Sequence, residues 1–207
     1  MHDVEAFREE RIEVLHALIK SHPLATLVTT TAQGLEANHI PLLIDPEPTP
    51  FGTLRGHVAR ANPLWRTSKD ANVLAVFQGP QGYITPSWYP SKAQHGKVVP
   101  TWNYAVVHVH GSLRVYEDAE WLRRLVTRLT ESQESPREKP WHITDAPEDY
   151  IDTMLKAIVG IEIPVQRMQG KWKMSQNRLP QDRNGVIKSL QSQGDAASLA
   201  MLNILRR

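Results

Sequence analysis

Residues 98–111 read VVPTWNYAVVHVHG, and this stretch decides how the chain is expected to fold. Over residues 107–115 apolar and polar side chains alternate. A period of two is typical of a half-buried strand. The polar and aromatic residues 101–104 come directly before this strand, at the strand end where small barrels and sandwiches tend to place binding sites.

The rest of the chain has several short strand patterns, with helices mainly at the edges and ends. We expect further strands over residues 24–30, 36–44, 52–58, 73–77, 82–86 and 159–165. We expect helices over residues 4–20, after Asp118, after a capping box formed by Asp145 and Glu148, over 180–190 and near the C-terminus. Because the strands come in runs, the pattern predicts a mainly β fold with helical additions, an antiparallel sheet or barrel rather than a doubly wound fold.

Composition excludes several classes of protein. The 207 residues are 41% hydrophobic, enough for a core, and include no cysteine, which excludes disulfides, thiol catalysis and thiolate-bound metals. No apolar run reaches transmembrane length and charges interrupt the N-terminus, so we expect a cytoplasmic protein without a membrane partner. The net charge of +2 does not by itself argue for nucleic acid, but it leaves weak contact with DNA open.

The first candidate site is the segment 55–63, RGHVARANP. Its glycine stands beside a strand end, Arg60 with Arg55 or His57 supplies charged donors, and a helix start is expected beyond Asn62. These are the parts that an anionic phosphate needs. The alternative, which the residues alone favour, is a strand-to-helix turn with solvated arginines.

Two further segments carry aromatic or donor side chains. Residues 87–92 and 101–104 together hold two tryptophans and two tyrosines in polar loops, which could bracket a flat ring or could plug a barrel end. Residues 170–178, GKWKMSQNR, gather cationic and amide donors. Such donors would stabilise the negative charge of a reduced flavin, or they could simply form a basic surface strand with one buried tryptophan.

The chain has nine histidines, which are potential metal ligands. His108 and His110 share one face of the expected strand, but no cysteine or carboxylate accompanies them. The metal signal is therefore weak, and histidines facing solvent or a subunit interface are the favoured interpretation. We expect no metal site, and no nucleophile with a base nearby identifies catalytic residues.

Long segments of the chain match one family in the expected order. They are HPLATLVT, GLEANHIPLLID, TLRGHVARANPLW, FQGPQGYITPSWYPSK, GKVVPTWNYAVVHVHG and GKWKMSQNR. Through them the chain resembles the PaiB family of FMN-binding negative transcriptional regulators. The resemblance implies an antiparallel split β-barrel, similar to pyridoxamine-phosphate oxidases and flavin reductases, that forms a homodimer with FMN held between the subunits. It implies a single FMN-binding domain over residues 1–207, with 180–207 as a C-terminal helical extension.

The resemblance also implies two sets of cofactor-binding residues. His57, Arg60 and Asn62 would face the phosphate and ribityl chain of FMN. The set expected at or near the isoalloxazine ring is Trp102, Asn103, Lys173, Ser175, Gln176 and Asn177.

Three functions remain open from the sequence. The protein could be a regulator that acts through the flavin redox state, an FMN-dependent oxidoreductase, or a haem-binding or haem-degrading protein with His57, His95, His108 or His110 as the iron ligand. The last expected helix is apolar and carries arginines only at its end. A recognition helix should expose basic and amide side chains along one face, so any effect on DNA is expected to be indirect.

Overall fold

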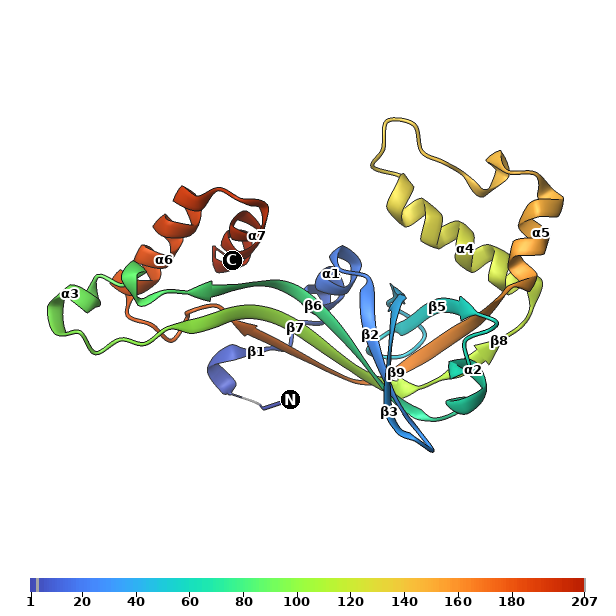
Figure 1. The fold of residues 1–207 in the computed structure, drawn as a ribbon, viewed down its shortest axis with the longest axis horizontal. Helices are drawn as coiled ribbons and strands as arrows, with labels where there is room; N and C mark the ends of the chain where they lie inside the picture. The colour runs from blue at the N-terminus through green and yellow to red at the C-terminus, as the bar shows by residue number, and fades with distance from the viewer. Residues whose placement is uncertain (3, 207) are drawn as a thin grey trace. The chain divides into compact units, whose positions relative to one another are not determined.

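The computed structural model describes residues 1–2 and 4–206, which divide into two compact units (Figure 1). The first unit holds the described residues of Met1–Leu15, Gln78–Val107 and Gln169–Arg207. The second unit holds His16–Phe77 and His108–Met168. Strands β6, β7 and β9 contribute residues to both units.

The elements follow one another along the chain as short strands and mostly short helices. The strands are β1 (Arg8–Glu9), β2 (Leu24–Thr31), β3 (Gly34–Pro41), β4 (Leu43–Asp45), β5 (Thr53–Ala59), β6 (Asn72–Ile84), β7 (Thr101–Ser112), β8 (Arg114–Tyr116) and β9 (Ile158–Lys173). The helices are η1 (Glu5–Phe7), α1 (Ile12–Ser21), α2 (Leu64–Thr67), η2 (Pro86–Trp88), α3 (Ser91–His95), α4 (Ala119–Glu134), η3 (Ile143–Asp145), α5 (Glu148–Lys156), α6 (Pro180–Gln193) and α7 (Ala196–Leu205). Within the described residues, no helix is both long enough and apolar enough to cross a bilayer.

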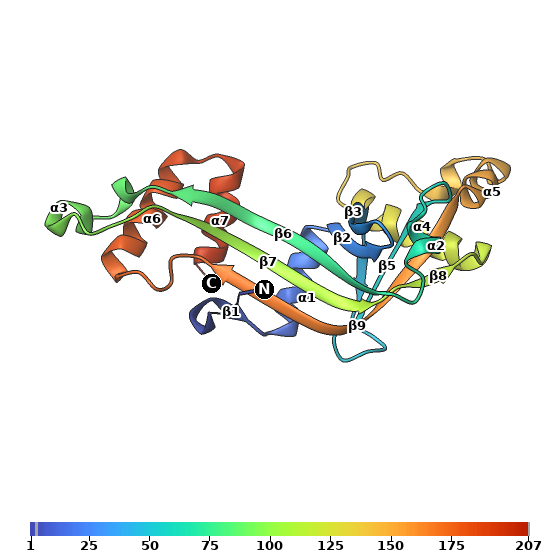
Figure 2. The ribbon, with the colours of Figure 1, turned by 60° about the horizontal axis from the view of Figure 1, so that its bottom comes forward.

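In the described part of the chain, nine strands form one sheet in the order β3-β2-β6-β7-β9-β5-β4, with β1 and β8 also paired to β9. Figure 2 shows β6, β7 and β9 as neighbours. The sheet is mainly antiparallel and does not close on itself. The predicted fold class, a mainly β split barrel with helical additions, is therefore confirmed.

The strands expected over 24–30 and 36–44 form a hairpin in the second unit. Strands β2 and β3 pair from Leu24 opposite Pro41 to Thr31 opposite Gly34, and two residues connect them. The strand expected over 36–44 is instead divided into β3 and β4. Leu42 separates them, and its N–H donates to the Pro23 carbonyl at 2.9 Å, in line with the β2–β3 register.

Two other expected boundaries were wrong in the first unit. The helix expected from residue 4 begins only at Ile12, because Arg8 and Glu9 pair instead with Lys171 and Gly170 of β9. The break expected between the strands over 73–77 and 82–86 is absent, since β6 continues from Asn72 to Ile84. Proline fixes a backbone angle that an extended strand accepts and removes only one hydrogen-bond donor.

The caps of the two long helices of the second unit differ from each other. Asp118 caps α4, accepting a hydrogen bond from the Trp121 N–H at 2.7 Å, as expected. The expected capping box of α5 was wrong. Asp145 closes the short η3 by accepting the His142 N–H at 2.8 Å, while Pro147 precedes α5 without a side-chain cap.

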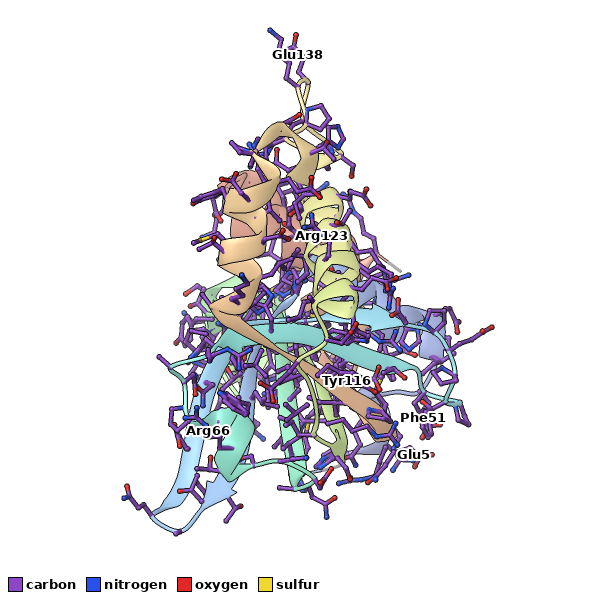
Figure 3. The ribbon with its side chains drawn as sticks, turned by 90° about the vertical axis from the view of Figure 1, so that its right-hand side faces the viewer. Glu5, Phe51, Arg66, Tyr116, Arg123 and Glu138 are labelled. Atoms are coloured by element: carbon purple, nitrogen blue, oxygen red, sulfur yellow. The ribbon has the colours of Figure 1, made fainter. Side chains whose placement is uncertain are left out.

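Helix α4 is seated on the second unit's sheet by one tryptophan. The Trp121 ring stacks on Tyr116 with centroids 4.5 Å apart and an interplanar angle of 6°. Figure 3 labels Tyr116 on the strand and Arg123 on α4. A Cβ atom added at Gly160 would lie 2.2 Å from the Trp121 ring. Gly160 therefore leaves the space that the indole fills.

A polar network lies on the sheet near the same helix. Arg55 Nε donates to Glu162 at 2.8 Å, and the Tyr116 hydroxyl donates to the other oxygen of Glu162 at 3.1 Å. Asp45 accepts hydrogen bonds from both Arg55 and Arg128, and Arg128 belongs to α4. Each half-buried charge thus has an opposite partner, as burial of charge requires.

Asp45→Asn is expected to lower the free energy of unfolding by about 2 kcal/mol at neutral pH, because two arginines lose a charged partner. Burial opposes ionisation of Asp45, but Arg128 and Arg55 outweigh it and hold its pKa below the ordinary value of 3.8. A lowered folded-state pKa contributes stability above the ordinary value and loses it as the pH falls. The difference between wild type and variant should therefore shrink below about pH 4 in urea-unfolding measurements.

Glu120→Gln is the matched control, since Glu120 forms an exposed pair with Arg124 within α4. Such a pair contributes less than about 1 kcal/mol. A loss of stability for Asp45→Asn that stays constant down to pH 3, or that equals the loss of the control, would contradict the assigned role of Asp45.

Candidate functional site

The nine predicted site residues fall into two groups, each within one unit. The β5-end group consists of His57, Arg60 and Asn62 in the second unit. The β7–β9 group lies in the first unit and consists of Trp102, Asn103, Lys173, Ser175, Gln176 and Asn177.

His57 is a half-buried histidine on β5 with an unused nitrogen. It lies directly opposite Gly160 of β9, and opposed residues of an antiparallel pair share one face of the sheet. Because Trp121 covers Gly160, His57 lies on the face that carries α4. Burial lowers the pKa of His57, and its buried Nδ1 has no hydrogen-bond partner among the residues that the structure describes. A neutral imidazole with a free nitrogen is suited to a polar ligand group.

Arg60 is already committed to the protein. Its guanidinium donates to the carbonyls of Lys156 and Ile158 at 2.8 and 3.2 Å. It also donates to Glu117 at 2.6 Å. The arginine therefore joins the end of α5 to the start of β9, and its positive charge is partly neutralised.

Asn62 orders the turn after β5. Its side-chain oxygen accepts the Leu64 N–H at 2.9 Å, and its amide donates to the Asn38 side chain at 2.8 Å. The Asn38 Nδ2 is buried and has no hydrogen-bond partner in the described part of the chain. A buried donor without a partner is costly unless a ligand or water accepts from it.

The β7–β9 group contains an exposed aromatic ring and a lysine. Trp102 is 55% exposed. It meets Tyr83 of β6 edge to face, with centroids 6.1 Å apart. Lys173 Nζ donates to the hydroxyl of Thr101, the residue before Trp102. The exposed pair of aromatic rings suits a planar ligand ring, and the group also contains a lysine that could favour a negatively charged one.

Asn103 and Ser175 form the buried support of this group. Both are nearly inaccessible, and the Asn103 amide donates to the Ser175 hydroxyl at 3.0 Å. The hydroxyl in turn lies 3.2 Å from the Asn103 side-chain oxygen. Ser175 has a φ of 60°, a left-handed conformation that is uncommon outside glycine. Such a strained backbone conformation persists only where surrounding contacts hold it in place.

The last two members shape the same turn. Gln176 accepts the Met174 N–H at 2.6 Å and donates to the Trp172 carbonyl, so its side chain is occupied within the turn. Asn177 is exposed. Within this group, Trp102, Lys173 and Asn177 are thus the side chains open to a ligand, whereas the other members hold the backbone.

Sequence reasoning missed two residues of these groups. Asn38 lies in one of the matched segments but was not named as a site residue. It stands two residues before the core residue Ile40 on β3, so both side chains lie on one face of the strand, and this was the available signal. Tyr83 was missed because a break was expected between residues 77 and 82, whereas the continuous strand β6 carries Tyr83 to Trp102.

The remaining candidate histidines are separate from one another in role. Burial lowers the pKa values of His108 and His110. Arg167 donates to His110 Nε2 at 2.9 Å, which requires that nitrogen to be unprotonated. His95 accepts the Lys97 N–H at 3.0 Å at the end of α3. Across the described residues, no cluster of three or more histidine, aspartate or glutamate side chains could hold a metal ion.

Comparisons with known proteins agree on a flavin-binding family. Residues 1–167 match the family described as "Putative FMN-binding domain". An uncharacterised protein of Emericella nidulans is 35% identical, with 96% of this chain and 93% of the relative covered. The protease synthase and sporulation protein PAI 2 of Bacillus subtilis is 32% identical, with 96% and 93% covered.

A solved structure shares the fold. The flavocytochrome Anf3 from Azotobacter vinelandii has a TM-score of 0.57 at 12% identity, with 80% of this chain and 69% of that chain covered. This likeness concerns the fold alone.

Asn103→Ala should lower the free energy of unfolding by about 1–3 kcal/mol, because it leaves the buried Ser175 hydroxyl without its partner. Ser175→Ala should act similarly. The double variant should lose less than the sum of the two, with a coupling of at least about 0.5 kcal/mol in urea-unfolding curves. The exposed Asn177→Ala serves as control and should change stability by less than about 0.5 kcal/mol. Strict additivity of the first two substitutions would disprove the pairing.

Proposed function

We propose, from the premise that this chain belongs to the PaiB family of FMN-binding split-barrel proteins, that it is a homodimer whose two described groups hold different parts of FMN. FMN, when bound, supplies the redox chemistry. The chain supplies binding, orientation and charge. In a homodimer the groups that meet one FMN need not come from the same copy.

The observation that carries this proposal is the exposed aromatic pair of Trp102 and Tyr83. Aromatic side chains contribute most when they are covered, so a flat ring lying on this pair would be favoured. Lys173 belongs to the same group and binds the Thr101 hydroxyl, and its charge would favour the electron density that a flavin gains on reduction. We assign the ring of FMN to this group, with Asn103, Ser175 and Gln176 fixing the backbone beneath it.

The β5-end group supports the ribityl and phosphate end. Within residues 1–2 and 4–206, the buried Nδ1 of His57 and Nδ2 of Asn38 lack hydrogen-bond partners. Hydroxyl or phosphate groups would satisfy them. Asn62 holds Asn38 in place. Arg60 contributes its positive charge and the two of its five N–H donors that the carbonyls and Glu117 do not occupy.

We propose a regulatory role of the PaiB type, in which flavin redox state alters the protein and any effect on DNA is indirect. Helix α7 supports the indirect route. It buries Met201, Leu202 and Leu205 and carries no Lys or Arg between Ala196 and Leu205. A helix of this kind packs against protein rather than reading a DNA groove.

An FMN-dependent oxidoreductase is the second candidate. The exposure of Trp102 and Tyr83, at 55% and 50%, leaves a ring-sized surface accessible to a nicotinamide or another small acceptor. Haem binding is the third outcome to be tested, through His57, His95, His108 or His110, because a protein named as a flavocytochrome shares the fold.

The absorbance spectrum and native mass of the purified protein test the proposal. We expect a flavin spectrum and a dimer. NAD(P)H consumption that depends on added FMN would favour the enzyme, and a salt-resistant, sequence-selective mobility shift would favour direct DNA binding. A Soret band lost in one His→Ala variant would favour haem. A colourless monomer that binds no added FMN would refute the proposal.

Lys173→Ala should weaken FMN binding by about 10- to 100-fold, the effect of removing one charge-assisted contact. Arg60→Ala should also weaken it, together with a loss of stability from its released carbonyls. Fluorescence titration of FMN measures both. Lys188→Ala, an exposed lysine of α6, is the control and should leave affinity unchanged. Unchanged curves for both site variants would remove the site assignment.

A further inference from the structure

The second unit contains a pocket outside both proposed flavin groups. Its volume is about 210 Å³, and it is lined by Arg55, Trp121, Arg124, Leu125 and Arg128. Three of the five lining residues are arginines, and this lining includes no carboxylate. Figure 3 shows α4, which carries four of the lining residues, rising beside the sheet.

Each of these arginines is held in place by an acid that does not line the pocket. Arg55 pairs with Asp45 and Glu162. Asp45 also binds Arg128, while Arg124 pairs with Glu120 one turn earlier on α4. Guanidinium groups fixed in advance lose less conformational freedom when they bind an anion.

The pairs leave donors unused. The hydrogen bonds among described residues employ Nε and Nη1 of Arg55, and Nη1 and Nη2 of Arg128. They employ only Nη1 of Arg124. A guanidinium has five N–H donors, so all three retain N–H groups that the pairs do not use. Guanidinium forks match the oxygen geometry of phosphate.

The remaining walls of the pocket are apolar. The Trp121 ring is fixed by its stack on Tyr116 and by the space left at Gly160. Leu125 follows one turn later on α4. Three cationic walls and a rigid indole suit an anion attached to a small organic group, and the pocket is too small for a whole flavin nucleotide.

We propose that this arginine pocket binds the phosphate group of a small phosphate monoester, at a site separate from FMN. None of the nine residues assigned to FMN lines it. Free phosphate shares the same chemistry, and the apolar wall favours the monoester. Arg124 is the most exposed of the three arginines and the least tied to the sheet, so it is the residue through which the site can be tested without disturbing the fold.

The test is calorimetric titration of the full-length protein with inorganic phosphate and, separately, with phenyl phosphate at low salt. We expect saturable binding with a Kd below about 1 mM, and tighter binding of phenyl phosphate. Equal affinity for the two would assign the pocket to free phosphate. Arg124→Gln should weaken binding by about tenfold or more.

Arg123→Gln is the matched control. Arg123 is the adjacent arginine of α4, but it pairs with Asp152 and does not line the pocket. The affinity of the Arg123→Gln protein for both probes should equal that of the wild type. The proposal would be overturned if neither probe bound at about 10 mM. It would also be overturned if Arg124→Gln and Arg123→Gln weakened binding equally.

Titration of FMN-saturated protein separates this inference from the proposed function. Phosphate binding that persists with FMN present supports a second site, whereas its abolition by FMN would assign the pocket to the flavin and overturn the inference. A protein that binds phenyl phosphate but no FMN would refute the proposed function and leave the arginine pocket standing.

Discussion

The pairing of β9 is the constraint on which the rest of the structure depends. This strand hydrogen-bonds to β5 and β8 in the second unit and to β1 in the first. A strand paired on both edges has little freedom to shift, since a slip of one residue would turn every side chain to the opposite face. The register therefore positions polar groups along β9 in both units. It sets Glu162 against Arg55 and Arg114, and it ends with Lys173 next to the turn that holds Ser175.

Local patterns were sufficient for much of the fold. The hairpin of β2 and β3, the cap of α4 at Asp118 and the left-handed break at Gly194 follow from signals within a few residues. The errors arose where a distant partner decided the outcome. Arg8 and Glu9 left the expected helix because β9 offered an open edge, and β6 ran through Pro80 because its neighbours kept it extended.

The candidate site shows the same division between what is local and what is not. The motifs indicated which residues to consider, and the structure places six of them in one unit and three in the other. Whether their side chains are free to bind a ligand could not be predicted from the motifs. Whether Arg60 is free depends on the carbonyls of Lys156 and Ile158, nearly a hundred positions along the chain. Asn103 is occupied by Ser175 for the same reason, because only the folded sheet brings β7 to the end of β9.

The fit between Trp121 and Gly160 has an evolutionary consequence. A residue with a side chain at position 160 would displace the indole, and a smaller residue at 121 would leave a void above the strand. Neither position can drift alone without loosening the helix from the sheet. We expect these two positions to change together among related chains, so that large aromatic residues at 121 accompany glycine at 160 and smaller ones permit alanine or serine there.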